Sequence, residues 1–261
     1  VAACPSHVMR EVFAPAAELV KGDPLVVSAS KGIEAGTLAI MTDVLVDVLG
    51  EAHRPRIGAL SGPSFAREVA AGMPTAVTVA APALAEAERM QALFATPSFR
   101  VYSSTDLVGV ELSGASKNVI AIAAGVSDGM GFGNSTRAAV IARGITETSR
   151  LVASAGGDPR TSSGLAGAGD LILTCTGDLS RNRTLGVRLG RGEKLSDILA
   201  EMTMVAEGVR NSETVIALAA KLGVELPICE QVRQFLHEGK PAAAAVADLL
   251  ARERKTEFWG V

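Results

Sequence analysis

The stretch FRVYSSTDLVGVELSGASKNVIAIAAGVS, residues 99–127 of this 261-residue chain, decides the fold because the sequence pattern changes within it. Residues 99–102 are a short β-type run, whereas residues 107–127 have the apolar spacing of one long helix. No β-type pattern follows Asp106. The sequence therefore predicts an α/β part at residues 1–112 and an all-helical part at residues 113–261.

Before this stretch, short β-type runs alternate with helical patterns, which indicates an open, mostly parallel sheet covered by helices. The predicted strands are residues 1–4, 25–30, 56–60, 76–80 and 99–102, and the predicted helices between them are residues 7–20, 34–49 and 83–94. After residues 107–127, the predicted helices are residues 135–155, 183–189, 209–221, 228–236 and 242–251.

Composition excludes several classes of protein. Hydrophobic residues make up 48% of the chain and charged residues 20%, as in a globular protein. A net charge of −3 and only 3% aromatic residues argue against a nucleic-acid surface. Charges interrupt the apolar runs before they reach membrane-spanning length. The three cysteines are scattered without metal-ligand spacing, so we expect a cytoplasmic protein without a metal.

Asp170 is the acidic residue that stands out, in the segment LAGAGDLILTCTGDLSRNRTLG at residues 165–186. Small and apolar residues surround it, and a buried carboxylate without a partner is costly. If Asp170 is buried, Lys117 is its natural partner. The alternative is a helix cap or a solvated acid in a turn.

Lys117 lies on an uncharged face of the predicted helix at residues 107–127. Its neighbours on that face are small or apolar: Val110, Ser113, Gly114, Ile120, Ala121 and Ala124. Such a lysine either extends to solvent or lies in a cleft, where loss of water lowers its pKa towards that of a proton donor. The sequence pattern leaves both possibilities open.

Residues 180–183, with the sequence SRNR, are predicted to begin a helix with Ser180 as its N-cap. A helix N-terminus attracts anions, and an arginine in the first turn adds a fork suited to phosphate. These features favour phosphate binding by Arg181 and Asn182. The alternative is a solvated basic helix start.

Three further candidates follow predicted strands, at the edge where open α/β sheets bind ligands. They are Ser6, Lys31 and the turn GPSFA at residues 62–66. A lysine in a surface loop is the alternative explanation for Lys31.

Several long blocks of the chain, in the same order, resemble the soluble NAD(P)-dependent glycerol-3-phosphate dehydrogenases of the bacterial type. The blocks are SASKGIE (28–34), SGPSFAREVA (61–70), ELSGASKNVIAIAAGVSDGMGFGNSTRAA (111–139), GLAGAGDLILTCTGDLSRNR (164–183) and EGVRN (207–211). The resemblance extends over essentially the whole chain. It implies a doubly wound Rossmann-like α/β domain, incomplete at its N-terminus, followed by an all-α domain like that of 6-phosphogluconate dehydrogenase.

The resemblance also implies a reaction. Such an enzyme interconverts sn-glycerol 3-phosphate and dihydroxyacetone phosphate with NAD or NADP, supplies glycerophospholipid synthesis, and forms a homodimer. The implied catalytic residues are Lys117, which transfers the proton, and Asp170 beside it. The implied substrate-binding residues are Lys31, Gly62, Ser64, Lys117, Asn118, Asp170, Ser180, Arg181 and Asn182. The implied cofactor-binding residues are Lys31, Ala66, Arg181, Val205 and Glu207.

This chain departs from the family pattern at its N-terminus. Members begin with a βαβ unit that carries GxGxxG, so about 70–80 residues are expected before Val1. Two alternative functions remain open at this point. One is a hydroxy-acid dehydrogenase of the 6-phosphogluconate group, and the other is a non-catalytic fragment that binds substrate or dimerises. The SRN cluster and the ordered blocks favour the glycerol-3-phosphate dehydrogenases.

Overall fold

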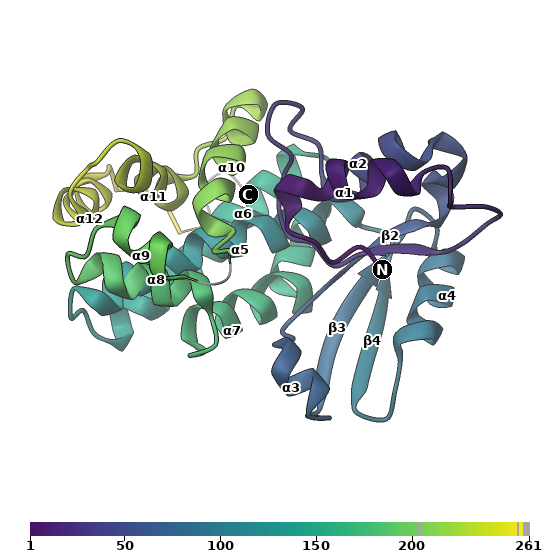
Figure 1. The fold of residues 1–261 in the computed structure, drawn as a ribbon. Helices are drawn as coiled ribbons and strands as arrows, with labels where there is room; N and C mark the ends of the chain where they lie inside the picture. Colours follow the sequence, from purple (N-terminus) through teal and green to yellow (C-terminus); the bar gives the residue numbers. More distant parts are fainter. Residues whose placement is uncertain (203–204, 255, 258–261) are drawn as a thin grey trace.

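The computed structural model describes residues 1–202, 205–254 and 256–257. A four-stranded sheet lies beside a bundle of helices (Figure 1). Its strands run in the order β1 (Val26–Ser28), β2 (Ile57–Ser61), β3 (Thr75–Ala80) and β4 (Phe99–Ser104). The fold class expected from the sequence, an α/β part followed by an all-helical part, is confirmed.

The sheet is mostly parallel but contains one antiparallel pairing. β1 pairs with β2, and β3 with β4, in parallel, whereas β2 and β3 are antiparallel. Of the predicted strand at residues 1–4, an isolated parallel bridge between Ala2 and Ser28 is present. The short helix α3 (Ala66–Ala70), which the sequence pattern did not reveal, lies in the connection between β2 and β3.

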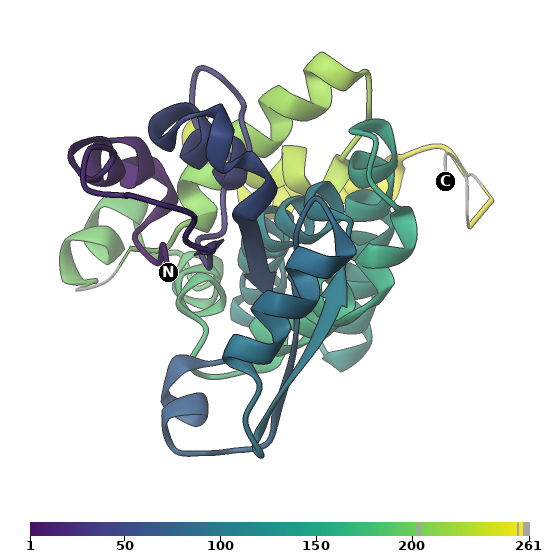
Figure 2. The same ribbon diagram turned by 90° about the vertical axis from the view of Figure 1, so that its right-hand side faces the viewer.

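Helices cover the sheet and bury its apolar side chains. α1 (Met9–Phe13) and α2 (Met41–Leu49) pack together, and Met9, Met41 and Leu45 form a core with Ile57 of β2. α4 (Leu84–Phe94) packs along β3 and β4 (Figure 2) and places Met90 against their valines.

Two predicted helices in this part are shorter in the structure. The prediction for residues 7–20 fails beyond Phe13, where a 3₁₀ turn contains Pro15, which has no N–H to continue the helix. The prediction for residues 34–49 is wrong before Met41. There Gly36 and Leu38 adopt positive φ angles, of 87° and 61°, which a right-handed helix does not contain.

The helical part is built around α5 (Leu107–Gly129), which lies at its centre in Figure 1. α5 is long and apolar enough to cross a membrane, but most of it is buried as the core helix of the bundle. The predicted division after Leu112 falls within this helix and stays a prediction. The helices that follow in the chain are α6 (Asn134–Ser154), η4 (Pro159–Ser163), the π-helical turn η5 (Leu165–Gly169), α7 (Asp170–Thr176), α8 (Arg181–Gly190), α9 (Leu195–Glu201), α10 (Gly208–Leu222), α11 (Pro227–His237) and α12 (Ala242–Ala251). The sequence predicted the start of η4, with Asp158 as its N-cap and Pro159 in its first turn, and the structure confirms it. The sequence pattern did not reveal η5, α7 and α9.

α5 and α8 approach each other through glycines on both helices. A Cβ atom at Gly125 or Gly129 would collide with a backbone carbonyl oxygen of α8. The same is true of Gly186 and Gly190, whose Cβ atoms would collide with carbonyl oxygens of α5. The two backbones therefore touch directly, and this contact fixes α8 against the helix that carries Lys117.

We expect Gly186→Ala to destabilise the protein by about 1–3 kcal/mol, because the added methyl group would force α5 and α8 apart. Alanine is by itself the better helix former by about 1 kcal/mol, so a net loss identifies the collision as its cause. Denaturant unfolding measures the change. Gly133→Ala is the matched control, since a Cβ there meets nothing within 4 Å. Equal stability of the two variants would contradict the close helix contact.

Candidate active site

Asp170 is the first residue of α7 and follows η5. Glycines let this segment pack tightly. A Cβ at Gly167 would collide with the carbonyl of Ser162, and one at Gly169 would lie 3.3 Å from Pro63. The Asp170 side chain is only 3% exposed. The carboxylate is therefore buried and needs partners, which excludes the solvated-acid alternative.

Two lysines from distant parts of the chain supply those partners. Nζ of Lys117 donates to Oδ1 of Asp170 at 2.8 Å, and Nζ of Lys31 pairs with Oδ2. The hydroxyl of Ser61, at the end of β2, also donates to Oδ2 at 3.4 Å. The pairing expected between Lys117 and Asp170 is thus present. Lys31 adds a second cation that the sequence reasoning did not connect with Asp170.

The surroundings of Lys117 hold its ammonium group inside the protein. Its side chain is 11% exposed, so it does not extend to solvent. Nζ donates a second hydrogen bond, of 2.9 Å, to Oγ1 of Thr174, one turn after Asp170 on α7. Gly114 precedes Lys117 by about one turn of α5, and a Cβ there would lie 3.4 Å from both Lys31 and Ser61. The absence of a side chain at Gly114 therefore lets the polar groups of Lys31, Ser61 and Lys117 converge.

Burial and charge set the protonation states of this cluster. Burial lowers the pKa of Lys117 to about 8, and the positive charge of Lys31 also lowers it, against the attraction of Asp170. For Asp170, burial favours the neutral acid, but Lys117 and Lys31 outweigh it and hold the pKa below its ordinary value. At neutral pH the carboxylate is ionised. Lys117 titrates close to the range in which a side chain can both give and take a proton.

The predicted SRNR helix start is present at the N-terminus of α8. Ser180 is its N-cap, and its hydroxyl accepts a hydrogen bond of 3.2 Å from the backbone N–H of Arg183. Arg183 forms ion pairs with Asp128 and Asp178. Arg181 is exposed and has no hydrogen bond or ion pair within the described part of the chain. The guanidinium of Arg181 is therefore available to a ligand.

Asn118 and Asn182 are joined to each other. The amide nitrogen of Asn182 donates to Oδ1 of Asn118 at 2.9 Å, and Oδ1 of Asn182 accepts from the backbone N–H of Gly208 at 2.9 Å. Both side chains are buried. This chain of hydrogen bonds links α5, α8 and the start of α10.

The turn after β2 lies against the segment that carries Asp170. Gly62 has a φ angle of 154°, and a Cβ there would lie 2.8 Å from the Cα of Val77. The hydroxyl of Ser64 donates to the carbonyl of Gly62 at 3.1 Å. Ala66 is exposed at the start of α3. Ser61, the residue before this turn, which the sequence reasoning passed over, donates the hydrogen bond by which this part of the chain contacts the Asp170 carboxylate.

The remaining candidates lie at the start of α10. Val205 is 41% exposed, and a carboxylate oxygen of Glu207 accepts a hydrogen bond of 2.9 Å from the backbone N–H of Ser6. The sequence reasoning missed Thr174 and Asn211. Thr174 could have been found from its spacing, because it lies four residues after Asp170 on the same helix.

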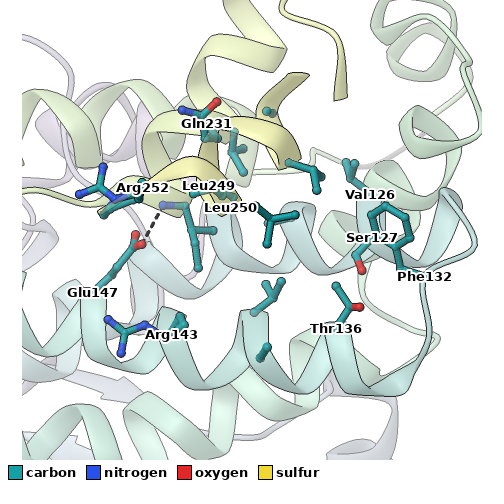
Figure 3. A pocket seen from close by; sticks show the side chains of 18 of the residues that line it. Val126, Ser127, Phe132, Thr136, Arg143, Glu147, Gln231, Leu249, Leu250 and Arg252 are labelled. Carbon is teal, nitrogen blue, oxygen red and sulfur yellow. Dashed lines mark hydrogen bonds between the residues drawn. The ribbon is translucent and has the colours of Figure 1, made fainter. Parts of the chain in front are cut away.

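A cavity of about 520 Å³ lies elsewhere, between α5, α6, α11 and α12 (Figure 3). Its walls are mostly apolar, with Arg143 and Glu147 among the polar residues (Figure 3). Lys31, Lys117 and Asp170 do not line it. This cavity is therefore separate from the Asp170 cluster.

Comparisons with known proteins give one consistent family. The model of the N-terminal part of NAD-dependent glycerol-3-phosphate dehydrogenase matches residues 1–87, and the model of its C-terminal part matches residues 106–247. The glycerol-3-phosphate dehydrogenase [NAD(P)+] of Geobacter sulfurreducens is 56% identical over 255 residues, 98% of this chain and 76% of that protein. The corresponding protein of Myxococcus xanthus is 53% identical over 261 residues, 100% of this chain and 78% of that protein.

Solved structures agree with these relatives. The glycerol-3-phosphate dehydrogenase of Coxiella burnetii superposes with a TM-score of 0.89 at 39% identity, over 96% of this chain and 76% of that one. The yeast enzyme superposes with a TM-score of 0.82 at 25% identity, over 97% of this chain and 76% of that one.

The fold and the buried lysine–carboxylate cluster define a Rossmann-type oxidoreductase with a helical domain. The chain belongs to the NAD(P)-dependent glycerol-3-phosphate dehydrogenases, and its activity is that of a glycerol-3-phosphate dehydrogenase with NAD(P)⁺ as coenzyme. This result decides against a hydroxy-acid dehydrogenase of the 6-phosphogluconate group. The chain spans about three quarters of the length of the relatives that it matches.

Proposed function

We propose that Lys117 transfers the proton in the interconversion of dihydroxyacetone phosphate and sn-glycerol 3-phosphate. The observation that carries this proposal is the buried contact of Lys117 with Asp170, at 2.8 Å, in a site that lowers the pKa of the lysine to about 8. When the ketone is reduced, Nζ gives a proton to the carbonyl oxygen. When the alcohol is oxidised, the neutral amine accepts the proton of the hydroxyl group.

Asp170 and Lys31 prepare Lys117 for this role. The carboxylate of Asp170 orients Nζ and favours its cationic form, whereas the charge of Lys31 opposes that form and keeps the proton transferable. Lys31 follows β1 and is proposed to contact the substrate as well. Gly62, Ser64 and Asn118 complete the proposed substrate site around it.

The residues present fit a nicotinamide dinucleotide at this edge of the sheet. Lys31 follows the carboxyl end of β1, the position at which open α/β sheets bind such cofactors. Ala66, Arg181 and Val205 are exposed, so their surfaces are available for contact. We infer that these residues, with Lys31 and Glu207, hold the cofactor. When bound, it supplies the hydride that is exchanged with the substrate carbon.

We propose that the N-terminus of α8 binds the substrate phosphate. Arg181 is the exposed arginine of its first turn, and the N–H groups of a helix N-terminus attract anions. Asn182 is held by Asn118 and Gly208, so we infer that it sets the position of this turn as well as lining the site. Ser180 caps the turn. Binding of the substrate phosphate at this turn would place the substrate carbonyl beside Lys117.

Arg181→Ala tests the phosphate site. We expect the variant to lose much of its preference for dihydroxyacetone phosphate over dihydroxyacetone, because a charge-assisted bidentate contact is removed. The ratio of kcat/KM for the two substrates measures this preference. Arg188→Ala is the control on the same helix, since Arg188 is paired with Glu193 and Glu201. If Arg181→Ala leaves the ratio at the wild-type value, the phosphate binds elsewhere, and Lys31 becomes the next candidate.

The homodimer, the cytoplasmic location and the supply of glycerophospholipid synthesis also remain inferences. They follow from the family to which the chain belongs.

A further inference from the structure

The start of α10 connects the two elements that carry the lysines. The side chain of Asn211 is buried in the first turn of this helix, and the residue is 1% exposed. Its amide nitrogen donates to the backbone carbonyl of Lys31 at 3.0 Å and to that of Ala115 at 3.3 Å. Ala115 lies on α5, two residues before Lys117. One side-chain amide therefore spans the gap between α5 and residues 29–32, which follow β1 and are called the Lys31 loop below.

The Lys31 loop is packed closely around this amide. A Cβ at Gly32 would lie 2.5 Å from Cβ of Ser6 and 3.0 Å from Oδ1 of Asn211. Gly32 thus packs directly against both Ser6 and Asn211. The hydrogen bond from Asn211 to the Lys31 carbonyl holds the loop in this position.

We propose that Asn211 is a positioning residue that fixes the Lys31 backbone against α5, so that both lysines reach opposite oxygens of Asp170. This inference rests on the roles proposed above for Lys31 and Lys117. Both hydrogens of the Asn211 amide are used by protein carbonyls, and the side chain is buried. Asn211 therefore acts through the lysines and does not touch the substrate.

A defined change in pH dependence follows from this geometry. The ionisable groups around Lys117 are Lys31 beside β1 and Asp170 and Cys175 on α7. If the Lys31 loop moves away, one positive charge leaves the cluster while Asp170 stays. The pKa of Lys117 then rises from about 8 towards its ordinary value. Ketone reduction needs the protonated lysine, so the alkaline fall in kcat moves to higher pH.

The test compares Asn211→Ala with Ser212→Ala by kcat, KM and thermal unfolding from pH 6 to 10. Ser212 is the matched control, because it is a buried polar residue of the same helix that contacts His237 and the carbonyl of Val209 instead of Lys31. Asn211→Ala is expected to lower kcat by on the order of 10²-fold, the effect of misplacing a reacting group. It is also expected to move the alkaline fall in kcat, called the alkaline limb of the pH profile below, to higher pH. Ser212→Ala is expected to keep the alkaline limb at the wild-type pH even if the variant is less stable.

Equal pH profiles for wild type and Asn211→Ala, with only stability reduced, would show that Asn211 is merely structural. If Asn211→Ala does not fold, Gly32→Ala displaces the loop from Ser6 and from Oδ1 of Asn211 and is expected to move the alkaline fall in kcat in the same direction. An unshifted limb in Gly32→Ala would also overturn the inference.

Lys31→Ala separates this inference from the proposed function. It removes the same charge directly and is expected to move the alkaline limb upward. If Lys31→Ala shifts the limb and Asn211→Ala does not, the positioning role is wrong while the proposed chemistry stands. If Lys117→Ala retains the wild-type limb, the proposed chemistry itself is wrong.

Discussion

Replacing Lys117 by alanine is expected to lower turnover by on the order of 10²–10⁴-fold, the usual contribution of a general acid–base group. The ammonium group of Lys117, which we propose as the proton source, lies against Asp170 and Thr174 in the buried cluster. Alanine cannot supply a proton at that point. The fold should persist, because Asp170 keeps Lys31 and Ser61 as partners.

Steady-state kinetics of both directions from pH 6 to 10 check this expectation. In the wild-type enzyme, kcat for ketone reduction should fall as pH rises through about 8, because Lys117 loses its proton there. Oxidation should show the opposite trend, since it needs the neutral amine. Lys221→Ala, at the exposed end of α10, is the control and should keep both profiles. Wild-type turnover in Lys117→Ala at every pH would rule out the proton-transfer role.

Replacing Asp170 by asparagine is the second change with a large expected effect, on both turnover and stability. The ammonium groups of Lys31 and Lys117 would then lie close together without the carboxylate charge that both of them contact. Removing one partner of a buried ion pair typically costs about 3–5 kcal/mol. Without the attraction of Asp170, the pKa of Lys117 falls further. Less of the lysine is protonated at neutral pH, so ketone reduction slows.

The stability difference should depend on pH in a predictable direction. The pKa of Asp170 is lower in the folded protein than in the unfolded chain, so the ionised carboxylate stabilises the fold above the ordinary pKa of 3.8. This contribution is lost as pH falls through the folded value. Urea unfolding of wild type and Asp170→Asn should therefore differ most near neutrality and converge in acid. Asp197→Asn, at an exposed position of α9, is the control. A constant difference across pH would contradict the proposed ion pairs.

Local patterns predicted the elements where neighbouring residues decide the conformation. The helix at residues 107–127 is present as α5, because its long apolar periodicity leaves little alternative. The prediction for residues 34–40 failed because the left-handed φ of Leu38 depends on the bridge between Ile33 and Ile40, which periodicity does not reveal. η5 was missed because its glycines have low helix propensity, and tertiary packing supplies what they lack.

The sequence by itself determined the order of the α/β and helical parts, the family, and the identity of Lys117, Asp170 and Arg181 as candidates. Side-chain type and spacing carry that information. Only the tertiary structure showed that Asp170 is buried and that Lys31, 139 residues away, shares its carboxylate with Lys117. It also revealed Asn211 between them. Contacts of this kind form when separate helices and strands pack together. Residue periodicity within one element does not specify the position at which another element packs against it.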